Sequence, residues 1–275
     1  MGHPVPRGRR QATQSGRDPA ESAPAHRTRR SGSVGVQTLS GIAQPAFAAS
    51  AQRPDSGLHA VLAAQLGEGL RGLSLDVSAS VQDALLAYLA LLEKWNRVYN
   101  LTAIRDPQAM LVQHLLDSLA VVPALQRRWS ATERGPELAD IGSGAGLPAI
   151  PIALAWPQVR YTLVEPVEKK AAFLRQAVGD LGLNDRVHVV CQRVQAIGPT
   201  SSFEFITCRA YATLAVFAQD VKAIAGAQTT LVALKGVRPD AEIDALGGPW
   251  AVDGIEALSV PFLNAHRHLV WMRRV

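Results

Sequence analysis

The spacing of apolar residues changes along the chain. Between residues 56 and 130, leucines and other large apolar side chains recur at three- and four-residue intervals, which is the spacing of one helix face. Further along, short apolar runs rich in β-branched residues alternate with helical stretches. Such runs are typical of strands that are buried on both faces of a parallel sheet. The pattern therefore predicts an N-terminal helical segment followed by an α/β sheet.

Start signals place three helices in the N-terminal segment. The first begins near Leu58, and the third begins at Asp106, a capping residue followed by a first-turn proline. The second begins at Ser80, which forms a capping-box-like pair with Asp83, and continues to Tyr99. We interpret the leucine and aromatic stripes of these helices as core rather than as a cofactor-binding surface.

Strand and helix patterns alternate through the second half of the chain. The predicted helices are Leu147–Trp156, Glu168–Leu181 and Leu214–Ile224. The predicted strands after the first are Arg160–Glu165, Val187–Cys191, Phe203–Cys208, Thr229–Leu234, Gly254–Val260 and His266–Met272. The last two strands follow each other without a helix between them, so we expect them to form a hairpin-like pair.

One stretch, Leu138–Pro148, carries the clearest binding signal. An apolar run ends in an acid, Asp140, and three glycines follow at every second position: Gly142, Gly144 and Gly146. Glycine allows tight turns and close approach of a ligand, and ligands of open α/β sheets bind at the carboxyl ends of the strands. The spacing is neither that of a dinucleotide fingerprint nor that of a phosphate loop. It predicts a nucleotide-type binding turn.

The charge is distributed unevenly. The chain of 275 residues has 28 basic and 23 acidic side chains, a net charge of +5. Residues 1–53 hold 8 basic and 2 acidic side chains, so the remainder holds 20 and 21 and is close to neutral. Nucleic-acid binding by the folded part must therefore come from a local patch rather than from bulk charge.

Three segments are predicted from composition. Residues 1–54 contain few large apolar side chains, so we expect a disordered basic tail, residues 55–130 the helical segment, and residues 131–275 the sheet domain. The arginines of the tail suit a non-specific RNA-binding arm or an organelle transit peptide, and a functionless extension is an equal alternative.

Cysteine usage and hydropathy indicate the compartment. Cys191 and Cys208 lie in strand-like runs far apart in the sequence, so we expect buried thiols in a reducing cytosol rather than a disulfide framework or a zinc site. No window approaches the roughly 18 continuous apolar residues of a membrane span. We predict a soluble, cytoplasmic protein that binds no membrane and no metal, and we favour a monomer.

The sequence resembles a known family. Its glycine turn resembles the first motif of Rossmann-like S-adenosylmethionine (SAM) methyltransferases. Seven separated motifs stand in the order and spacing of the bacterial small-subunit rRNA guanine-N7 methyltransferases (RsmG, formerly glucose-inhibited division protein B). They are Glu93–Asn96, Tyr99–Ile104, His114–Ser118, Asp140–Pro148, Arg209–Ala210, Ala233–Gly236 and Arg267–Val270. The likeness covers roughly residues 70–273 and excludes the tail.

The resemblance implies a fold and a reaction. The fold is a class I SAM methyltransferase with a largely parallel seven-stranded sheet, whose antiparallel last strand fits the hairpin-like pair. The reaction is transfer of the SAM methyl group to N7 of one guanine in 16S rRNA, which makes the small ribosomal subunit the partner. Motif matches assign cofactor contacts to Gly142, Leu147, Val194, Gln195 and Arg209, and we expect Asp140, Gly144 and Gly146 of the same turn to bind the cofactor as well. Gln195 and Tyr211 depart from the family's usual glutamate and phenylalanine.

Further roles follow from residue chemistry. Glu165 ends a strand, where a carboxylate can accept hydrogen bonds from both ribose hydroxyls. Guanine N7 has an exposed lone pair, so no general base is needed, and positioning would carry catalysis. Arg209 as a bidentate donor, Tyr211 as a stacking ring and Lys235 as an electrostatic group are the candidates that position the guanine. His114 is expected to pack or cap, and Arg267–His268 to anchor the last strands.

Two alternatives stay open. One is a methyltransferase of the same fold that acts on tRNA, protein or a small molecule, because the sheet does not encode the acceptor. The near-neutral folded part favours this alternative. The other is a non-catalytic SAM-binding ribosome-assembly factor. That alternative predicts SAM binding without turnover.

Overall fold

The structure is a computed structural model that describes residues 56–129, 135–199 and 203–275. The predicted tail, residues 1–54, lies outside the described residues, so its predicted disorder and roles stay predictions. The predicted boundaries near residues 55 and 130 also stay predictions.

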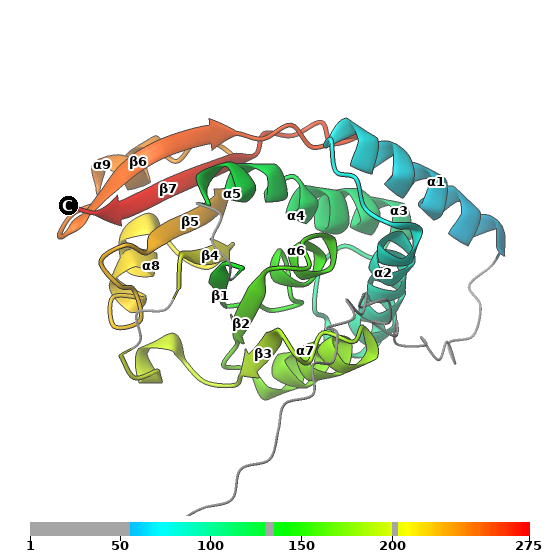
Figure 1. The fold of residues 1–275 in the computed structure, drawn as a ribbon, viewed down its shortest axis with the longest axis horizontal. Coiled ribbons are helices and arrows are strands. Elements are labelled where there is room, and N and C mark those ends of the chain that lie inside the picture. Colours follow the sequence, from blue (N-terminus) through cyan, green and yellow to red (C-terminus); the bar gives the residue numbers. More distant parts are fainter. Residues whose placement is uncertain (1–55, 130–134, 200–202) are drawn as a thin grey trace, which may run out of the picture. The chain divides into compact units, whose positions relative to one another are not determined.

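A seven-stranded sheet runs through the described part of the chain (Figure 1), in the order β3-β2-β1-β4-β5-β7-β6. The strands are β1 (Glu137–Ile141), β2 (Arg160–Val164), β3 (Val187–Val190), β4 (Phe205–Arg209), β5 (Thr230–Lys235), β6 (Trp250–Ala257) and β7 (His268–Arg274). Strands β1 to β5 are parallel, and β7 lies antiparallel between β5 and β6. This order confirms the predicted class I methyltransferase sheet with its antiparallel last strand.

Alternation along the strands divides the core into two clusters. In β1, Leu138 belongs to one cluster, whereas Ala139 and Ile141 belong to the other. Successive strand residues point to opposite faces, so each face of the sheet has its own cluster. This explains why the strands read as nearly continuous apolar runs.

The helices cover these two faces. The N-terminal helices are α1 (Ser56–Gly72), α2 (Ala79–Tyr99), α3 (Pro107–Met110), α4 (Asp117–Leu119) and α5 (Val122–Arg128). Those of the sheet region are α6 (Ala149–Ala155), α7 (Glu168–Asp180), α8 (Leu214–Asp220) and α9 (Asp240–Asp244). The larger cluster joins α1 to α7 to one face of the sheet, and α8 packs on the other.

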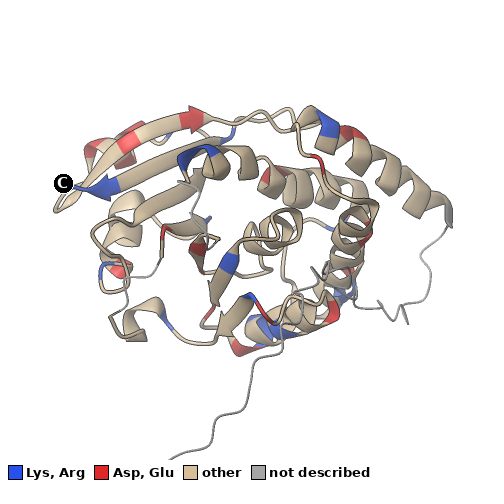
Figure 2. Ribbon diagram, in the orientation of Figure 1, with Lys and Arg blue, Asp and Glu red and all other residues tan. Residues whose placement is uncertain are grey.

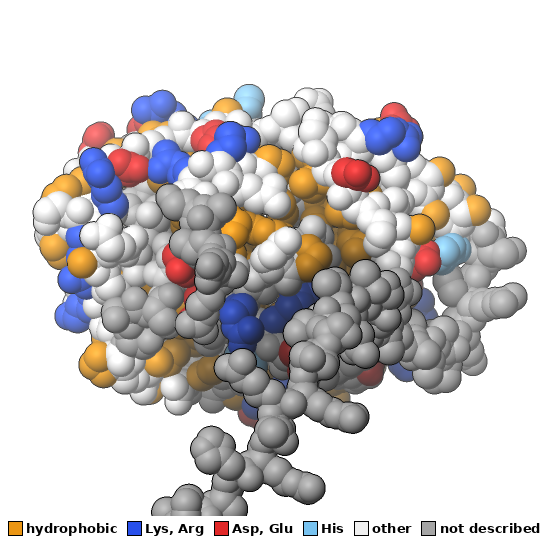
Figure 3. Space-filling model, viewed as in Figure 1, with side chains coloured by type: hydrophobic (Ala, Val, Ile, Leu, Met, Phe, Trp, Pro, Cys, Tyr) orange, Lys and Arg blue, Asp and Glu red, His pale blue; other side chains and the backbone are white. Residues whose placement is uncertain are grey.

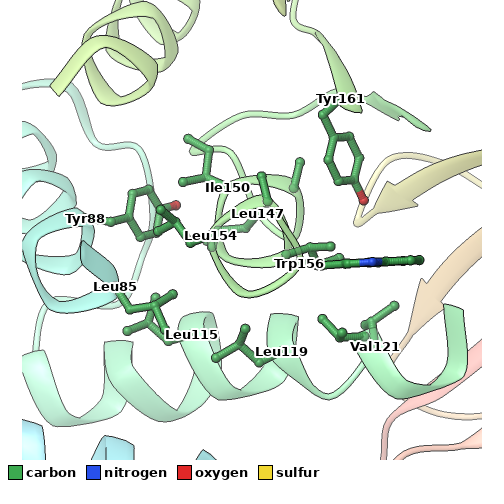
Figure 4. Close-up of a cluster of buried hydrophobic side chains, with 14 of the residues drawn as sticks. Leu85, Tyr88, Leu115, Leu119, Val121, Leu147, Ile150, Leu154, Trp156 and Tyr161 are labelled. Carbon is green, nitrogen blue, oxygen red and sulfur yellow. The ribbon is translucent and has the colours of Figure 1, made fainter. Parts of the chain in front are cut away.

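Figure 4 shows the centre of the larger cluster, where α6 lies between the N-terminal helices and the sheet. Ile150 and Leu154 of α6 lie among Leu85 of α2 and Leu115 and Leu119 of the following helices. The N-terminal helices therefore complete the core of the sheet, as their apolar stripes predicted.

The helix start signals are partly corrected. Asp106 caps α3 as predicted, because its carboxylate accepts from the amide of Ala109 at 2.7 Å. The start predicted for the second helix is wrong, because α2 is capped by Ser78, whose hydroxyl accepts from the amide of Val81 at 3.3 Å. Ser78 has the extended backbone of a cap, whereas Ser80 already lies in the first turn.

The third predicted helix contains a turn that its pattern did not reveal. Residues Leu111–Leu116 form a π-helix between α3 and α4. One extra residue per turn rotates the side chains that follow, and such turns often occur at functional sites. Here His114 lies within the turn and Asp117 directly follows it, and both line a cavity described below.

The bounds of the last strand pair differ from the prediction. Strand β6 begins at Trp250 rather than at Gly254, and its register against β7 shifts between Val252 and Gly254. Gly254 thus lies within the strand instead of starting it. It stands at the register shift, and a glycine inside a strand often marks such an irregularity.

Two further expectations meet the structure here. Cys208 is buried, but Cys191 is only partly so, and its thiol donates to the Glu168 carboxylate at 2.9 Å; the expectation of two buried thiols is therefore wrong for Cys191. Among the described residues, the helical stretch Pro107–Arg128 is long and apolar enough to span a membrane, yet 78% of its apolar window is buried inside the fold. It is a core helix.

Charges of both signs are mixed over this fold. Figure 2 shows acidic residues on β6 next to basic residues on β7 and α5. On the face seen in Figure 3, basic and acidic side chains are interspersed among apolar and neutral ones. The distribution agrees with the near-neutral charge of residues 54–275.

Candidate functional site

The glycine turn lies between β1 and α6 at the carboxyl end of the sheet. Gly142, Gly144 and Gly146 have φ angles of +70°, +57° and +81°, a region that other residues rarely adopt. The amides of Gly142 and Ser143 donate to the carbonyl of Val164 at 2.9 and 3.2 Å. These bonds fold the turn over the end of β2, where the sequence predicts a ligand.

Glu165 follows β2 and is only 3% exposed. Its two carboxylate oxygens accept from the amides of Gly144 and Val167, each at 2.9 Å. Glu165 therefore holds the glycine turn in place, and each oxygen keeps a lone pair for a further donor. The contact with ribose hydroxyls stays a prediction.

Asp140 lies beneath the turn and is 1% exposed. One carboxylate oxygen accepts from the Thr207 hydroxyl at 2.8 Å, whereas Oδ2 has no hydrogen-bond partner among the described residues. Burial raises the pKa of Asp140 to about 7, although the Thr207 bond acts in the opposite direction. A buried carboxylate oxygen without a partner is costly and suits a site that a polar ligand completes.

The N-terminal helices reach the turn through Tyr88. This α2 residue is fully buried, and its hydroxyl donates to the carbonyl of Ala145 at 2.6 Å. Burial raises the pKa of Tyr88 well above its usual value, so the hydroxyl stays protonated and remains a donor. Sequence reasoning missed this contact and placed the α2 stripe in the core only.

Tyr211 lies against the glycine turn from the other side. A Cβ atom at position 142 would stand 2.7 Å from Cδ2 of its ring. The hydroxyl donates to Asp220 at 2.9 Å, and the ring meets Phe217 edge-on with centroids 6.3 Å apart. Burial, with the nearby Asp220, raises the pKa of Tyr211 to about 12. The ring is thus fixed beside the turn.

The predicted adenine-side pair follows β3. Val194 and Gln195 lie in a short 3-10 helix, Val194–Ala196. Val194 is buried in the smaller core cluster, on the sheet face covered by α8, whereas Gln195 is exposed. Leu147, the last predicted loop contact, is buried within the larger core cluster.

A cavity of about 460 Å³ opens at the carboxyl ends of β4 and β5. Its lining comes from the π-helix region, from β4 and β5, and from the last strand pair: Ile104, Gln113, His114, Asp117, Arg209, Ala210, Leu234, Lys235, Gly236, Leu258, Arg267 and His268. The structure thus gathers residues from five of the seven sequence motifs around one cavity.

Two arginines share one carboxylate in this cavity. Asp117 Oδ2 accepts from Arg209 Nη1 at 3.1 Å, and Asp117 Oδ1 accepts from Arg267 Nε at 2.6 Å. Asp117 is 5% exposed. Arg267 was expected only to anchor the last strands; its carbonyl does accept from Leu258, but its side chain reaches the helical segment.

His114 is neutral in this cavity. Its Nδ1 lies 3.1 Å from the carbonyl of Gln113, which can only accept, so we assign the proton to Nδ1; Nε2 then accepts from the Thr102 hydroxyl at 2.9 Å. Burial, and after it the charge of Arg209, lowers the pKa of His114 to about 4. The expected packing role is in keeping with this bonding.

Lys235 lies at the end of β5, but its ammonium is already engaged. It donates to both carboxylate oxygens of Glu242, at 2.8 and 3.0 Å, and to the carbonyl of Ala212 at 3.0 Å. Its charge is therefore met within the protein, and its predicted electrostatic role stays a prediction.

Metal-binding chemistry was not expected, and the described ranges contain no group of three or more His, Cys, Asp and Glu residues that could hold a metal ion. The expectation of a metal-free site stays a prediction.

Comparison with known proteins places this site in context. The family model described as rRNA small subunit methyltransferase G matches residues 81–270. Similar proteins named ribosomal RNA small subunit methyltransferase G include one from Nitrosospira multiformis, 46% identical over 77% of this chain and 97% of its own length. One from an Acidovorax species is 45% identical over 76% of this chain and 94% of its own length.

Solved structures with a similar fold include a SAM dependent methyltransferase from Aquifex aeolicus, 17% identical with a TM-score of 0.46, covering 68% of this chain and 98% of that one. The family match extends over more than half of the chain, and the relatives are matched over nearly their full length. The chain therefore belongs to the rRNA small subunit methyltransferase G family, as its seven motifs predicted.

Proposed function

We propose that this enzyme transfers the methyl group of SAM to N7 of a guanine in 16S rRNA of the small ribosomal subunit. Family membership supports the reaction class. The main support for the acceptor site is the cavity at the end of β4, which is lined by Arg209 and Ala210. The next residue, Tyr211, contacts the glycine turn at Gly142, so the cavity and the turn are neighbours.

The residues of the turn fit SAM. A Cβ atom at Gly144 would meet only the carbonyl of Gly142, at 3.7 Å, so the backbone there is open to a ligand. Glu165 keeps lone pairs for ribose hydroxyls, and Asp140 Oδ2 lacks a partner. Val194–Gln195 would lie along the adenine. When bound, SAM supplies an electrophilic methyl group on its sulfonium.

Residues that line the cavity would position the guanine. Arg209 Nη1 is held by Asp117 and, at 3.4 Å, by the Gln113 carbonyl, which leaves its other N–H groups for the base. Donation to guanine O6 alone keeps the N7 lone pair available, whereas the bidentate grip on O6 and N7 would occupy it. Arg209 thus orients the base without blocking the reacting atom.

No residue has to remove a proton. The N7 lone pair reacts directly, and His114, with a pKa of about 4, is neutral and bonded through both ring nitrogens. Tyr211 lies against Gly142 of the turn and directly follows Ala210 of the cavity lining, so its ring would offer an aromatic face for an unstacked base. The rate would come from orientation and from exclusion of water.

Transfer of labelled methyl from SAM tests this proposal. The acceptors are small subunits and 16S rRNA that lack the modification, and the modified base is mapped by cleavage at N7-methylguanine. We expect one modified guanine and at least a tenfold loss of rate in Arg209→Ala. The matched control is Arg238→Ala, because Arg238 also pairs with an acid, Asp240, but lies outside the cavity.

The alternatives give different results. Labelling of tRNA or protein instead of 16S rRNA would replace the proposed acceptor. SAM binding without turnover on any acceptor would indicate a non-catalytic assembly factor. We further propose that the enzyme acts as a monomer in the cytoplasm, where its ribosomal substrate resides; sedimentation of the full chain tests the monomer.

A further inference from the structure

We propose that Asp117 is the positioning residue of the acceptor cavity: its one carboxylate aligns Arg209 and Arg267 and limits the charge that they present to the RNA. This inference rests on the proposed function, because it assigns a role within the same cavity.

The geometry of Asp117 suits this role. Each carboxylate oxygen accepts from a different guanidinium, Arg209 at 3.1 Å and Arg267 at 2.6 Å. The side chain of Asp117 is 6% exposed, whereas those of Arg209 and Arg267 are 21% and 24% exposed. The carboxylate is therefore the most buried of the three groups, although Asp117 also lines the cavity. Both of its oxygens are engaged by guanidinium groups, so Asp117 acts through the two arginines.

Three separate parts of the chain meet at this carboxylate. Asp117 directly follows the π-helix, Arg209 ends β4, and Arg267 precedes β7. The arginines are 92 and 150 residues away from Asp117 in the sequence. Removal of the carboxylate would leave two like charges facing each other, which would turn both side chains away from their present directions.

The charge balance points to an anionic ligand. One carboxylate against two guanidinium groups leaves one positive charge in this cluster, while Lys235 is neutralised by Glu242 and His114 is uncharged. A phosphodiester of the RNA strand matches a single positive charge. Asp117 thus limits this cluster to the single positive charge that a phosphodiester would meet.

The protein contains a matched control. Asp253 also bridges two arginines, Arg128 Nη1 at 2.7 Å and Arg273 Nε at 3.0 Å. It lies on β6, away from the cavity lining. Asp253→Asn therefore makes the same chemical change to a carboxylate that also pairs with two arginines but is more exposed, at 27%, and lies outside the acceptor site.

The test compares Asp117→Asn with Asp253→Asn in the full chain. Methyl transfer to 16S rRNA gives kcat and KM, and binding of a labelled 16S rRNA fragment at several salt concentrations gives the slope of log K against log salt. We expect Asp117→Asn to lower kcat at least tenfold, to leave KM unchanged or lower, and to steepen the salt slope by up to about one. Asp253→Asn should change none of the three.

A structural role alone would give a different pattern. Equal effects of the two variants, or a fall in kcat with an unchanged salt slope, would overturn the inference. If Asp117→Asn does not fold, Asp117→Glu keeps the charge and should retain the wild-type slope with a smaller loss of kcat; a changed slope would count against us. If the wild-type enzyme does not methylate 16S rRNA, the proposed function fails first, and the binding slopes still decide the electrostatic role of Asp117.

Discussion

The ring of Tyr211 lies so close to Gly142 that a Cβ atom at position 142 would stand 2.7 Å from its Cδ2 atom. The two residues are far apart in the sequence, and β1 and β4 bring them together as neighbours in the sheet. The glycine is thus required twice, once for its φ of +70° and once for the space that the ring occupies. This relationship ties the cofactor turn to a residue of the proposed acceptor site.

Gly142→Ala should therefore be more damaging than a glycine substitution with backbone strain alone. Gly182 has a similar φ of +66° but no atom within 4 Å of its would-be Cβ, so Gly182→Ala is the matched control. We expect about 1–2 kcal/mol of destabilisation from strain in both variants, and about 1–3 kcal/mol more in Gly142→Ala. SAM affinity, measured by titration calorimetry, should fall only in Gly142→Ala. Equal losses of stability in urea unfolding would show that Tyr211 exerts no steric constraint.

Two fully buried tyrosines should respond oppositely to loss of the hydroxyl. Tyr88 donates to the Ala145 carbonyl, whereas the Tyr161 hydroxyl has no hydrogen-bond partner among the described residues. Tyr88→Phe leaves a buried carbonyl without its donor and should cost about 1–3 kcal/mol of unfolding free energy, and it should weaken SAM binding by loosening the turn. Tyr161→Phe should be neutral or stabilising. Chemical denaturation of both variants checks this, and a larger loss in Tyr161→Phe would contradict it.

The capping of α2 distinguishes two serines. Ser78→Ala removes the hydroxyl that accepts from the Val81 amide and should lower the unfolding free energy by about 1 kcal/mol. Ser80 stands two residues after the capping position, inside the first turn of α2. Ser80→Ala should therefore change stability by less than about 0.5 kcal/mol. Thermal unfolding of the two variants side by side suffices. A larger loss of stability in Ser80→Ala than in Ser78→Ala would instead support the capping box that the sequence suggested.

Stability between pH 4 and 7 should contain two opposing contributions. The pKa of His114 is lowered from 6.5 to about 4. Between these two pH values the unfolded chain binds a proton that the folded chain does not, so stability rises with pH. The pKa of Asp140 is raised to about 7, so the folded chain keeps a proton that the unfolded chain has lost, and stability falls with pH. Each contribution has a slope of about 1.4 kcal/mol per pH unit where it acts fully.

Single substitutions should separate these contributions. Relative to the wild type, Asp140→Asn should become more stable as pH rises from 4 to 7, because only the His114 contribution remains. His114→Gln should become less stable over the same window. Urea unfolding at half-unit pH steps measures both differences, in which the other titrating groups cancel. Parallel pH profiles for all three proteins would refute the assignment.

Local patterns in the sequence were enough to predict the sheet and its turn. The apolar runs placed the strands, and the glycines at 142, 144 and 146 placed the turn at the end of β1, because turn geometry and strand burial depend on neighbouring residues. The same applies to Asp106, whose capping bond spans three residues. The predicted start of α2 was wrong because two nearby serines, Ser78 and Ser80, both carry the capping signal.

The relationships within the acceptor cavity were decided by the tertiary structure. Asp117, Arg209 and Arg267 each appeared in a motif, yet no local pattern indicates that one carboxylate serves two arginines 92 and 150 residues away. Their meeting depends on the strand order β4-β5-β7 and on the helical segment packing over that edge. The bond from Tyr88 to the turn depends on the same packing. Local sequence encodes hydrogen bonds and burial within an element, whereas long-range charge pairing exists only once the elements have been assembled.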